Sequence, residues 1–145
     1  MHVPDGFINV SVSAATGVIS FGTLWAYIRS ASSLIADKFI ALTGMMTALI
    51  FVLQMINFPV AAGTSGHLLG GALAVIVLGP RLGLICLSVV VIIQSLLFAD
   101  GGLSALGINV MNMAIVTSVT AWVVVKYWIS LFVIKLFLCM CLTDL

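Results

Sequence analysis

The stretch that decides the fold is residues 82–99, LGLICLSVVVIIQSLLFA, which contains no charged side chain. A membrane-spanning α-helix needs roughly 20 consecutive, mostly apolar residues, so this stretch has the composition and length of one span. It ends at Asp100-Gly101-Gly102, a combination typical of a turn. Residues 82–99 therefore predict a helix that crosses a membrane and stops at that turn.

The composition of the whole chain points to the same environment. Hydrophobic residues make up 63% of the 145 residues and charged residues 6%, with a mean hydropathy of +1.38. A soluble domain carries about 25% charged residues. A chain with so few polar side chains cannot cover a globular surface, so lipid must be its solvent. We expect a single all-α domain over residues 1–145, a polytopic transmembrane helical bundle with no affinity for nucleic acid.

Working outward from residues 82–99, the apolar runs predict about five membrane helices. These runs cover about residues 10–28, 39–58, 67–79, 82–99 and 108–125. The run 67–79 is short for a span, and Gly66, Gly70 and Ala74 repeat every four residues, a spacing that lets helix backbones approach closely. We therefore expect residues 67–79 to form a helix packed within the protein rather than against lipid.

The C-terminal segment, residues 122–145, is expected to differ from the rest of the bundle. The fifth run ends at Lys126, and the apolar residues 127–145 carry Lys135 in their middle. A long basic side chain can extend its charge from an apolar segment to the membrane interface. Residues 127–145 therefore predict a snorkelling or interfacial helix.

The three cysteines give no sign of redox or metal chemistry. Cys86 lies inside an apolar run, where a buried thiol is ordinary. Cys139 and Cys141 are separated by one residue, whereas common zinc and redox motifs have two residues between the cysteines. All three are interpreted as structural.

The charged residues predict the orientation of the bundle. If the spans alternate, one side receives four basic residues, Arg29, Lys38, Arg81 and Lys126. Asp5 and Asp100 fall on the opposite side. Because basic residues mark the cytoplasmic side, the N-terminus, the loop at 59–67 and the turn at Asp100 are predicted to be extracytoplasmic. The chain has two histidines, His2 and His67, and both then lie on the same face.

The first two residues have the donors of a metal chelate. The α-amine of Met1, the peptide nitrogen of His2 and its imidazole lie within chelating reach of one another, and imidazole suits nickel, copper and zinc. No basic segment precedes the first apolar run, so a secretory signal is not expected and Met1 is expected to be retained. Residues 1–9 are thus a predicted metal-binding segment, and the loop 59–67 would add the imidazole of His67 as a fourth nitrogen.

Two other interpretations compete for these residues. The histidines could be ordinary interfacial side chains, an interpretation about as strong as the metal site on spacing alone. Residues 63–66, GTSG, also match the G-x-S-G pattern of rhomboid intramembrane serine proteases, which need a histidine on a separate membrane helix. The only candidates are His67, which is two residues from Ser65, and His2, which lies outside any span, and chance easily produces a four-residue match. We therefore expect no catalytic residue and no resident cofactor.

Polar side chains inside the predicted spans are interpreted mainly as partners in interhelical hydrogen bonds. They are Gln54, Asn57, Gln94, Asn109 and Asn112. Asn109 and Asn112 lie on the outer half of their helix, and together with Ser65 they are candidates to hold the metal ligands in place.

Several sequence blocks, in a fixed order along the chain, resemble one known family. The blocks are 1–7 (MHVPDGF), 63–71 (GTSGHLLGG), 78–81 (LGPR), 98–103 (FADGGL), 105–107 (ALG), Asn109 and Asn112-Met113. They resemble the substrate-binding membrane subunit of cobalt and nickel energy-coupling-factor (ECF) transporters, the CbiM/NikM type. The resemblance covers residues 1 to about 116, and the agreement in order is more specific than any one block.

The resemblance implies a multi-pass protein of the cell (inner) membrane that captures Co²⁺ or Ni²⁺ outside the cell and has no catalytic activity. It implies that the ligands come from Met1, His2 and His67. The implied partners are a transmembrane ECF coupling protein, cytoplasmic ABC-type ATPases and a small companion membrane protein. The imported metal would serve cobalamin biosynthesis or nickel enzymes.

The chain departs from the family in its last part. Family members are longer, and residues 122–145 show no family pattern. The alternative function is therefore a shortened, non-transporting membrane subunit that binds metal or partners without moving either. The sequence does not separate cobalt from nickel, since both ions accept nitrogen donors.

Overall fold

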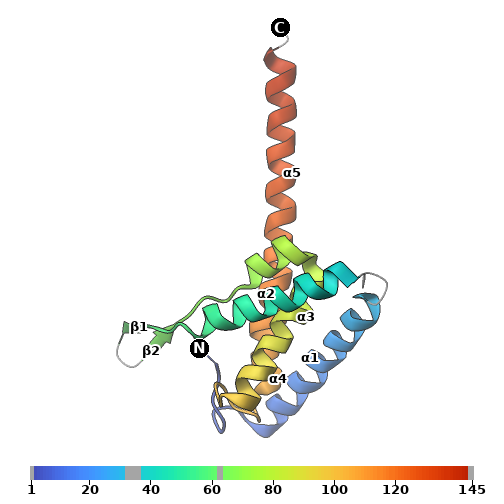
Figure 1. Cartoon of the computed structure of the whole chain (residues 1–145). Coiled ribbons are helices and arrows are strands. Elements are labelled where there is room, and N and C mark those ends of the chain that lie inside the picture. The colour runs from blue at the N-terminus through green and yellow to red at the C-terminus, as the bar shows by residue number, and fades with distance from the viewer. Residues whose placement is uncertain (1, 32–36, 62–63, 144–145) are drawn as a thin grey trace.

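The computed structural model of the chain is a bundle of helices with one small β-ribbon (Figure 1). It describes residues 2–31, 37–61 and 64–143, with side chains at 2–31, 39–59 and 66–130. In chain order the elements are α1 (Val10–Ala31), α2 (Asp37–Met55), β1 (Phe58–Ala61), β2 (Thr64–Gly66), α3 (Gly71–Leu97), α4 (Leu106–Val110), the π-helix η2 (Met111–Val116) and α5 (Thr117–Thr143).

Three stretches of the described chain are long and apolar enough to cross a membrane: α1, α3 and Leu106–Ser130. A shorter apolar helix covers Phe39–Met55, within α2. The predicted all-α bundle is therefore confirmed, with three long apolar helices and one shorter helix rather than five separate spans. α2 ends at Met55 instead of Phe58, because Phe58 already belongs to strand β1.

The predicted third and fourth helices are joined in α3, which kinks in its first half. Gly79 has φ 79° and ψ 170°, outside the helical region, and Pro80 follows it. A proline ring inside a helix clashes with the backbone carbonyl of the preceding turn and has no N–H to donate. Glycine tolerates the positive φ that the resulting bend needs. The sequence 78–81 thus bends a helix and does not separate two spans by a loop.

The prediction that a helix starts at His67 is wrong. Gly70 adopts a left-handed conformation with φ 73°, and α3 begins only at the next residue, Gly71. Gly66 and Gly70 therefore do not share a helix face with Ala74. Ala74 itself is fully buried in the core.

One continuous helical stretch runs from α4 through η2 into α5. The prediction that this helix ends at Lys126 is wrong, because α5 continues to Thr143 and contains no glycine or proline. The Nζ of Lys126 lies 5.0 Å from the centre of the Trp122 ring, a cation–π contact that leaves the helix uninterrupted. α5 extends well beyond the other helices (Figure 1).

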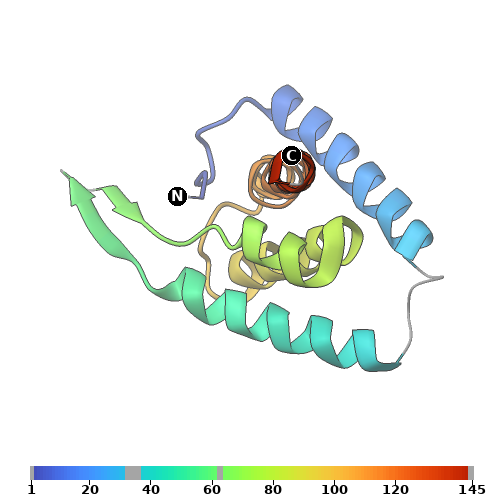
Figure 2. The same ribbon diagram turned by 90° about the horizontal axis from the view of Figure 1, so that it is seen from above.

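α3 lies at the centre of the bundle and contacts α1, α2, α4, η2 and α5 (Figure 2). Its Leu87, Val90 and Val91 are fully buried and pack with Val110 and Ala114 from the last helical stretch. Lipid tails are as apolar as these side chains, so close packing holds such helices together more than exclusion from water does.

Cys86 packs at the contact between α2 and α3. Its Sγ accepts a hydrogen bond from the Thr47 hydroxyl (3.3 Å), and the thiol is fully buried, as the structural interpretation predicts. The side chains of Cys139 and Cys141 lie outside the described residues.

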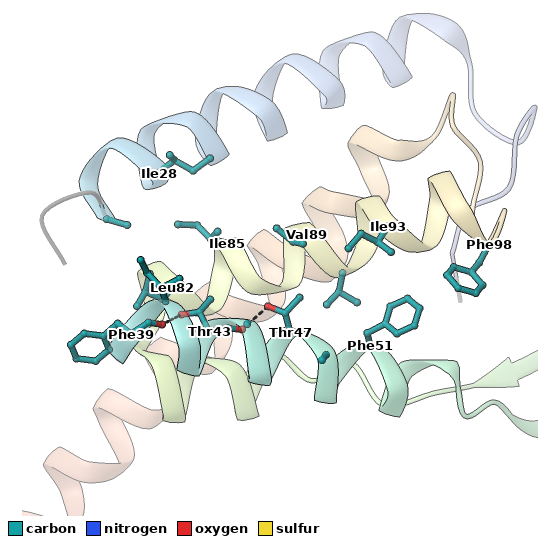
Figure 3. Close-up of a pocket in the computed structure, with 15 residues that line it drawn as sticks. Ile28, Phe39, Thr43, Thr47, Phe51, Leu82, Ile85, Val89, Ile93 and Phe98 are labelled. Carbon is teal, nitrogen blue, oxygen red and sulfur yellow. Dashed lines mark hydrogen bonds between the residues drawn. The ribbon is translucent and has the colours of Figure 1, made fainter. Parts of the chain in front are cut away.

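An apolar pocket of about 800 Å³ lies between α1, α2 and α3 (Figure 3). The Thr43 hydroxyl on its wall donates to the carbonyl oxygen of Phe39 (2.7 Å), and the Thr47 hydroxyl donates to that of Thr43 (2.7 Å). Among the described side chains, neither a histidine nor a charged residue lines it, so this pocket is separate from the site described below.

The predicted loop at 59–67 contains a short antiparallel ribbon. β1 pairs with β2 in a register that places Phe58 opposite Gly66 and Pro59 opposite Ser65. Proline is tolerated at the edge of such a pair because its missing N–H is not needed there. The ribbon projects from the bundle and returns, which leaves His67 directly after β2 (Figure 2).

Candidate metal centre

The N-terminal segment is tied to the last helical stretch through the backbone of Val3. The Val3 N–H donates to Asn109 Oδ1 (2.8 Å), and Asn109 Nδ2 donates to the Val3 carbonyl oxygen (3.1 Å). The same carbonyl accepts the N–H of Gly102 (2.9 Å). These three hydrogen bonds fix Val3, and with it the neighbouring His2, against the turn that follows α3.

Asp5 provides a second attachment of the same segment. Its Oδ1 accepts the N–H (2.8 Å) and the hydroxyl (2.6 Å) of Ser104. The hydroxyl first, and then the N–H, lower the pKa of the Asp5 carboxyl below its ordinary value of 3.8, so the group is ionised at neutral pH. Ser13 in α1 donates to the carbonyl oxygen of Ser104 and joins the first helix to this network.

The N-terminal segment packs directly on the backbone of the turn after α3. A Cβ atom on Gly101 would lie 2.8 Å from the Cβ of His2, and one on Gly102 would lie 2.4 Å from the nitrogen of Asp5. Gly101 also has φ 98°, a conformation that favours glycine. The two glycines are therefore needed for the close approach.

His67 lies in the loop between β2 and α3. Its Nδ1 lies 3.1 Å from the carbonyl oxygen of Leu68. A carbonyl only accepts, so we assign the proton to Nδ1, which leaves the lone pair of Nε2 free. Gln54, fully buried near the end of α2, donates from Nε2 to the carbonyl oxygen of Leu69 (2.7 Å) and anchors this loop.

The two histidine rings, far apart in the sequence, lie next to each other. The ring centroids of His2 and His67 are 5.5 Å apart and the ring planes differ by 20°. Two imidazoles that bind one ion at about 2.0 Å have centroids roughly 4.4 to 6.2 Å apart, depending on the angle between them. Both ring nitrogens of His2 and Nε2 of His67 are buried and have no hydrogen-bond partner among the described residues. Buried polar atoms are normally paired, so these nitrogens suit a cation.

The surroundings of His2 keep its imidazole neutral. Only 2% of the His2 side chain is exposed, and its Nε2 lies 3.6 Å from Oδ2 of Asp100, which is 33% exposed. Burial lowers the pKa of His2 below its ordinary value of 6.5; the Asp100 charge opposes this shift and His67 adds to it. A neutral imidazole is the form that binds metal ions.

The two asparagines predicted to support the site have different surroundings. Asn109, on α4, is buried and clamps Val3 as described above. Asn112 lies on η2, and its exposed side chain makes no hydrogen bond within the described part of the chain. The geometry therefore links Asn109, and not Asn112, to the N-terminal segment.

Two other predicted site residues fall outside what the structure describes. They are Met1 and the side chain of Ser65. Within residues 2–31, 37–61 and 64–143, no group of three or more His, Cys, Asp or Glu side chains is arranged to hold a metal ion.

Sequence reasoning missed several residues that build this end of the molecule. Asp100 and Gly101 were assigned only to a turn, and Gln54 only to contacts between helices. The single local signal for the first two is their position in the block 98–103, FADGGL. Ser104 carries no signal, since a serine after a turn is ordinary.

The long apolar helices define a class, a multi-pass helical membrane protein, and two imidazoles lie next to each other in it. The chain belongs to the family of the cobalt uptake substrate-specific transmembrane region, CbiM, whose model matches residues 2–145. The match extends past residue 116, where the resemblance of the sequence blocks ends. This is a family of transporter membrane components and not of enzymes, which removes the protease interpretation.

Individual relatives agree with this family. A protein of Archaeoglobus fulgidus assigned as a fused nickel transport protein, NikMN, is 47% identical over 80% of this chain and 38% of its own length. The cobalt transport protein CbiM of Geobacter sulfurreducens is 32% identical over 87% of this chain and 37% of its own length. A crystal structure of a truncated transition metal transporter superposes with a TM-score of 0.84 at 30% identity, over 90% of this chain and 61% of that one. The chain thus spans between 37% and 61% of the length of these relatives.

Proposed function

We propose that this chain is the substrate-binding membrane component of an ATP-driven ECF-type transporter that takes up Co²⁺ or Ni²⁺. The observation that carries the proposal is the pair of imidazoles of His2 and His67, which have buried, unpartnered nitrogens and lie at a spacing that fits one shared ion. The family match and the nickel and cobalt transport proteins among its relatives support the choice of metal.

The proposed donor set contains four nitrogens. Nδ1 of His2 is the ring nitrogen that can close a chelate ring with the peptide nitrogen of its own residue, and the α-amine of Met1 closes a second ring. Nε2 of His67 completes the set, because Nδ1 of that ring is engaged by Leu68. A compact nitrogen-only site favours late first-row metals over magnesium and calcium, which prefer oxygen.

The site is proposed to face the outside of the cell. The end of α1 that carries Arg29 and the start of α2 that carries Lys38 lie together, away from the N-terminal segment and the ribbon (Figures 1 and 2). Basic residues mark the cytoplasmic side, so the histidine pair belongs to the opposite side. Release of the ion inward then requires the His67 loop to move away from His2.

The proposed partners are a transmembrane coupling protein, cytoplasmic ABC-type ATPases and a small companion membrane protein. The fused NikMN relatives support the companion, because a second unit is joined to the metal-binding one in those proteins. The coupling protein and the ATPases follow from the family alone. The alternative, a shortened subunit that binds metal without moving it, predicts the same metal site but no uptake.

Titration calorimetry of the full chain in detergent, with Ni²⁺ or Co²⁺, tests the site. Loss of residues that only orient a metal ligand costs about 10–100-fold in affinity. We therefore expect His2→Ala and His67→Ala each to weaken binding by at least about 100-fold. Inserting one glycine between Met1 and His2 should do the same, since it breaks the chelate ring.

A matched control is the insertion of one glycine after Gly6, beyond the attachments at Val3 and Asp5, which should leave affinity unchanged. Unchanged affinity in both histidine variants would refute the proposed site. Metal uptake by cells that express the chain with the coupling protein and the ATPases then separates the two functions. Binding without uptake would favour the non-transporting subunit.

A further inference from the structure

One acidic side chain beside the histidine pair has no role in the donor set. The carboxylate of Asp100 lies at the edge of the site, with Oδ2 3.6 Å from Nε2 of His2. It reaches from a partly exposed position to a ring that is almost completely buried. That ring nitrogen has no hydrogen-bond partner among the described residues.

The backbone before Asp100 bends so that this carboxylate lies near the His2 ring. Ala99 has φ 52°, a left-handed conformation that costs a non-glycine residue about 1–3 kcal/mol unless its surroundings hold it. The N–H groups of Phe98 (3.1 Å) and Asp100 (3.2 Å) both donate to the carbonyl oxygen of Gln94, which folds the chain over the end of α3. Such a conformation at the edge of a site indicates a functional constraint.

We propose that Asp100 is a positioning residue for His2, a role that rests on the proposed function. Its carboxylate stabilises the form of the ring with the proton on Nε2, so Nδ1 is left unprotonated and faces the shared ion. Ligating histidines commonly donate their second ring N–H to a carboxylate, which fixes the tautomer and the ring orientation. The 3.6 Å separation exceeds a hydrogen bond of about 2.7–3.2 Å, but the attraction between the Nε2 proton and the carboxylate charge acts at this distance before a metal ion binds.

The glycines of the turn make this contact possible. Gly101 leaves room for the Cβ of His2. The hydrogen bond between Val3 and Asn109 holds the N-terminal segment close to this glycine. The loop 99–102 therefore acts on His2 in two ways, through the space it leaves and through the acceptor it supplies. No charged group other than Asp100 lies within ion-pair distance of His2 among the described residues.

The tautomer of His2 is the direct test of this role. Nitrogen NMR of the metal-free full chain, labelled with ¹⁵N-histidine in detergent, reports which ring nitrogen carries the proton. We expect the Nε2–H form of His2 to dominate in the wild type and the Nδ1–H form to gain population in Asp100→Ala. Asp100→Asn should remain close to wild type, because its amide oxygen still accepts. The signals of His67 serve as an internal control and should not change.

Nickel calorimetry on the same samples gives the second readout. Asp100→Ala should bind Ni²⁺ about 10–100-fold more weakly, with Asp100→Asn less affected. Asp37→Asn, which removes a carboxylate at the distant start of α2, should bind like the wild type.

The outcomes separate this proposal from the proposed function. An unchanged tautomer and unchanged affinity in Asp100→Ala would overturn the positioning role, even if His2→Ala abolishes binding. Lost affinity with an unchanged tautomer would also overturn it, since Asp100 would then bind the ion itself. Wild-type affinity in His2→Ala would instead refute the metal site, while the tautomer measurement on metal-free protein would stand.

Discussion

At the scale of single residues, short-range attachments hold the N-terminal segment against the turn that follows α3. Val3 is held by Asn109 and Gly102, and Asp5 is held by Ser104. These bonds do not touch a metal ion, yet they decide where the His2 ring lies. The proposed metal site needs such anchors, because an N-terminal segment without them is poorly ordered.

The Asp5 attachment predicts a pH-dependent contribution to stability. The pKa of Asp5 in the folded protein lies below the ordinary 3.8, so its contribution is fully present above pH 3.8 and is lost as the pH falls through the lower folded-state value. Asp5→Asn should therefore unfold at a lower temperature than the wild type at neutral pH. The difference should vanish well below pH 3.8 in a thermal melt in detergent. A difference that persists at the lowest pH would show that the carboxylate charge is not what holds Ser104.

At the scale of elements, the packing of α1 on α4 positions the last helical stretch. A Cβ atom on Gly107 would lie 2.4 Å from the Cα of Gly17, and the hydroxyl of Ser20 donates to the Gly107 carbonyl oxygen (2.7 Å). Backbone meets backbone at this crossing, so neither helix can yield by a side-chain rotation. The crossing lies two residues before Asn109 in the sequence. It therefore sets the position of Asn109, whose side chain forms hydrogen bonds with the backbone of Val3.

Gly107→Ala should separate the two helices and destabilise the protein by about 1–3 kcal/mol, as overpacking commonly does. Gly44→Ala is the matched control, because nothing lies within 4 Å of a Cβ atom there. Gly44→Ala should raise the free energy of unfolding by up to about 1 kcal/mol, because alanine loses less conformational freedom than glycine when the chain folds. Chemical denaturation of both variants in detergent measures the effect. Equal stability of the two variants would contradict the tight crossing.

At the scale of the whole molecule, the sequence predicts the bundle better than its connections. Apolar runs locate α1, α2 and the last helical stretch, because length and composition alone set those helices. They do not reveal that α3 passes through Gly79-Pro80, since a kink and a break have the same local sequence. The ribbon at 58–66 is also missed, because its two strands are too short to show an alternating pattern.

The candidate site was predictable only in part, for a related reason. His2 and His67 follow from residue type and from the predicted side of the membrane. The contact of Val3 with Asn109 joins residues 106 positions apart, and no local sequence pattern predicts it. The approach of Asp100 to His2 depends on the left-handed conformation of Ala99. This conformation could not be predicted, because alanine rarely adopts it.

The central claim is that nitrogen donors from the N-terminus and from His67 hold one metal ion. X-ray absorption at the nickel edge of the nickel-loaded full chain tests it most directly. We expect an inner shell of about four nitrogen donors in a planar arrangement, with the outer-shell signal of two imidazoles that drops to one in His67→Ala. A six-coordinate shell of oxygen donors, or a spectrum unchanged in His67→Ala, would contradict it.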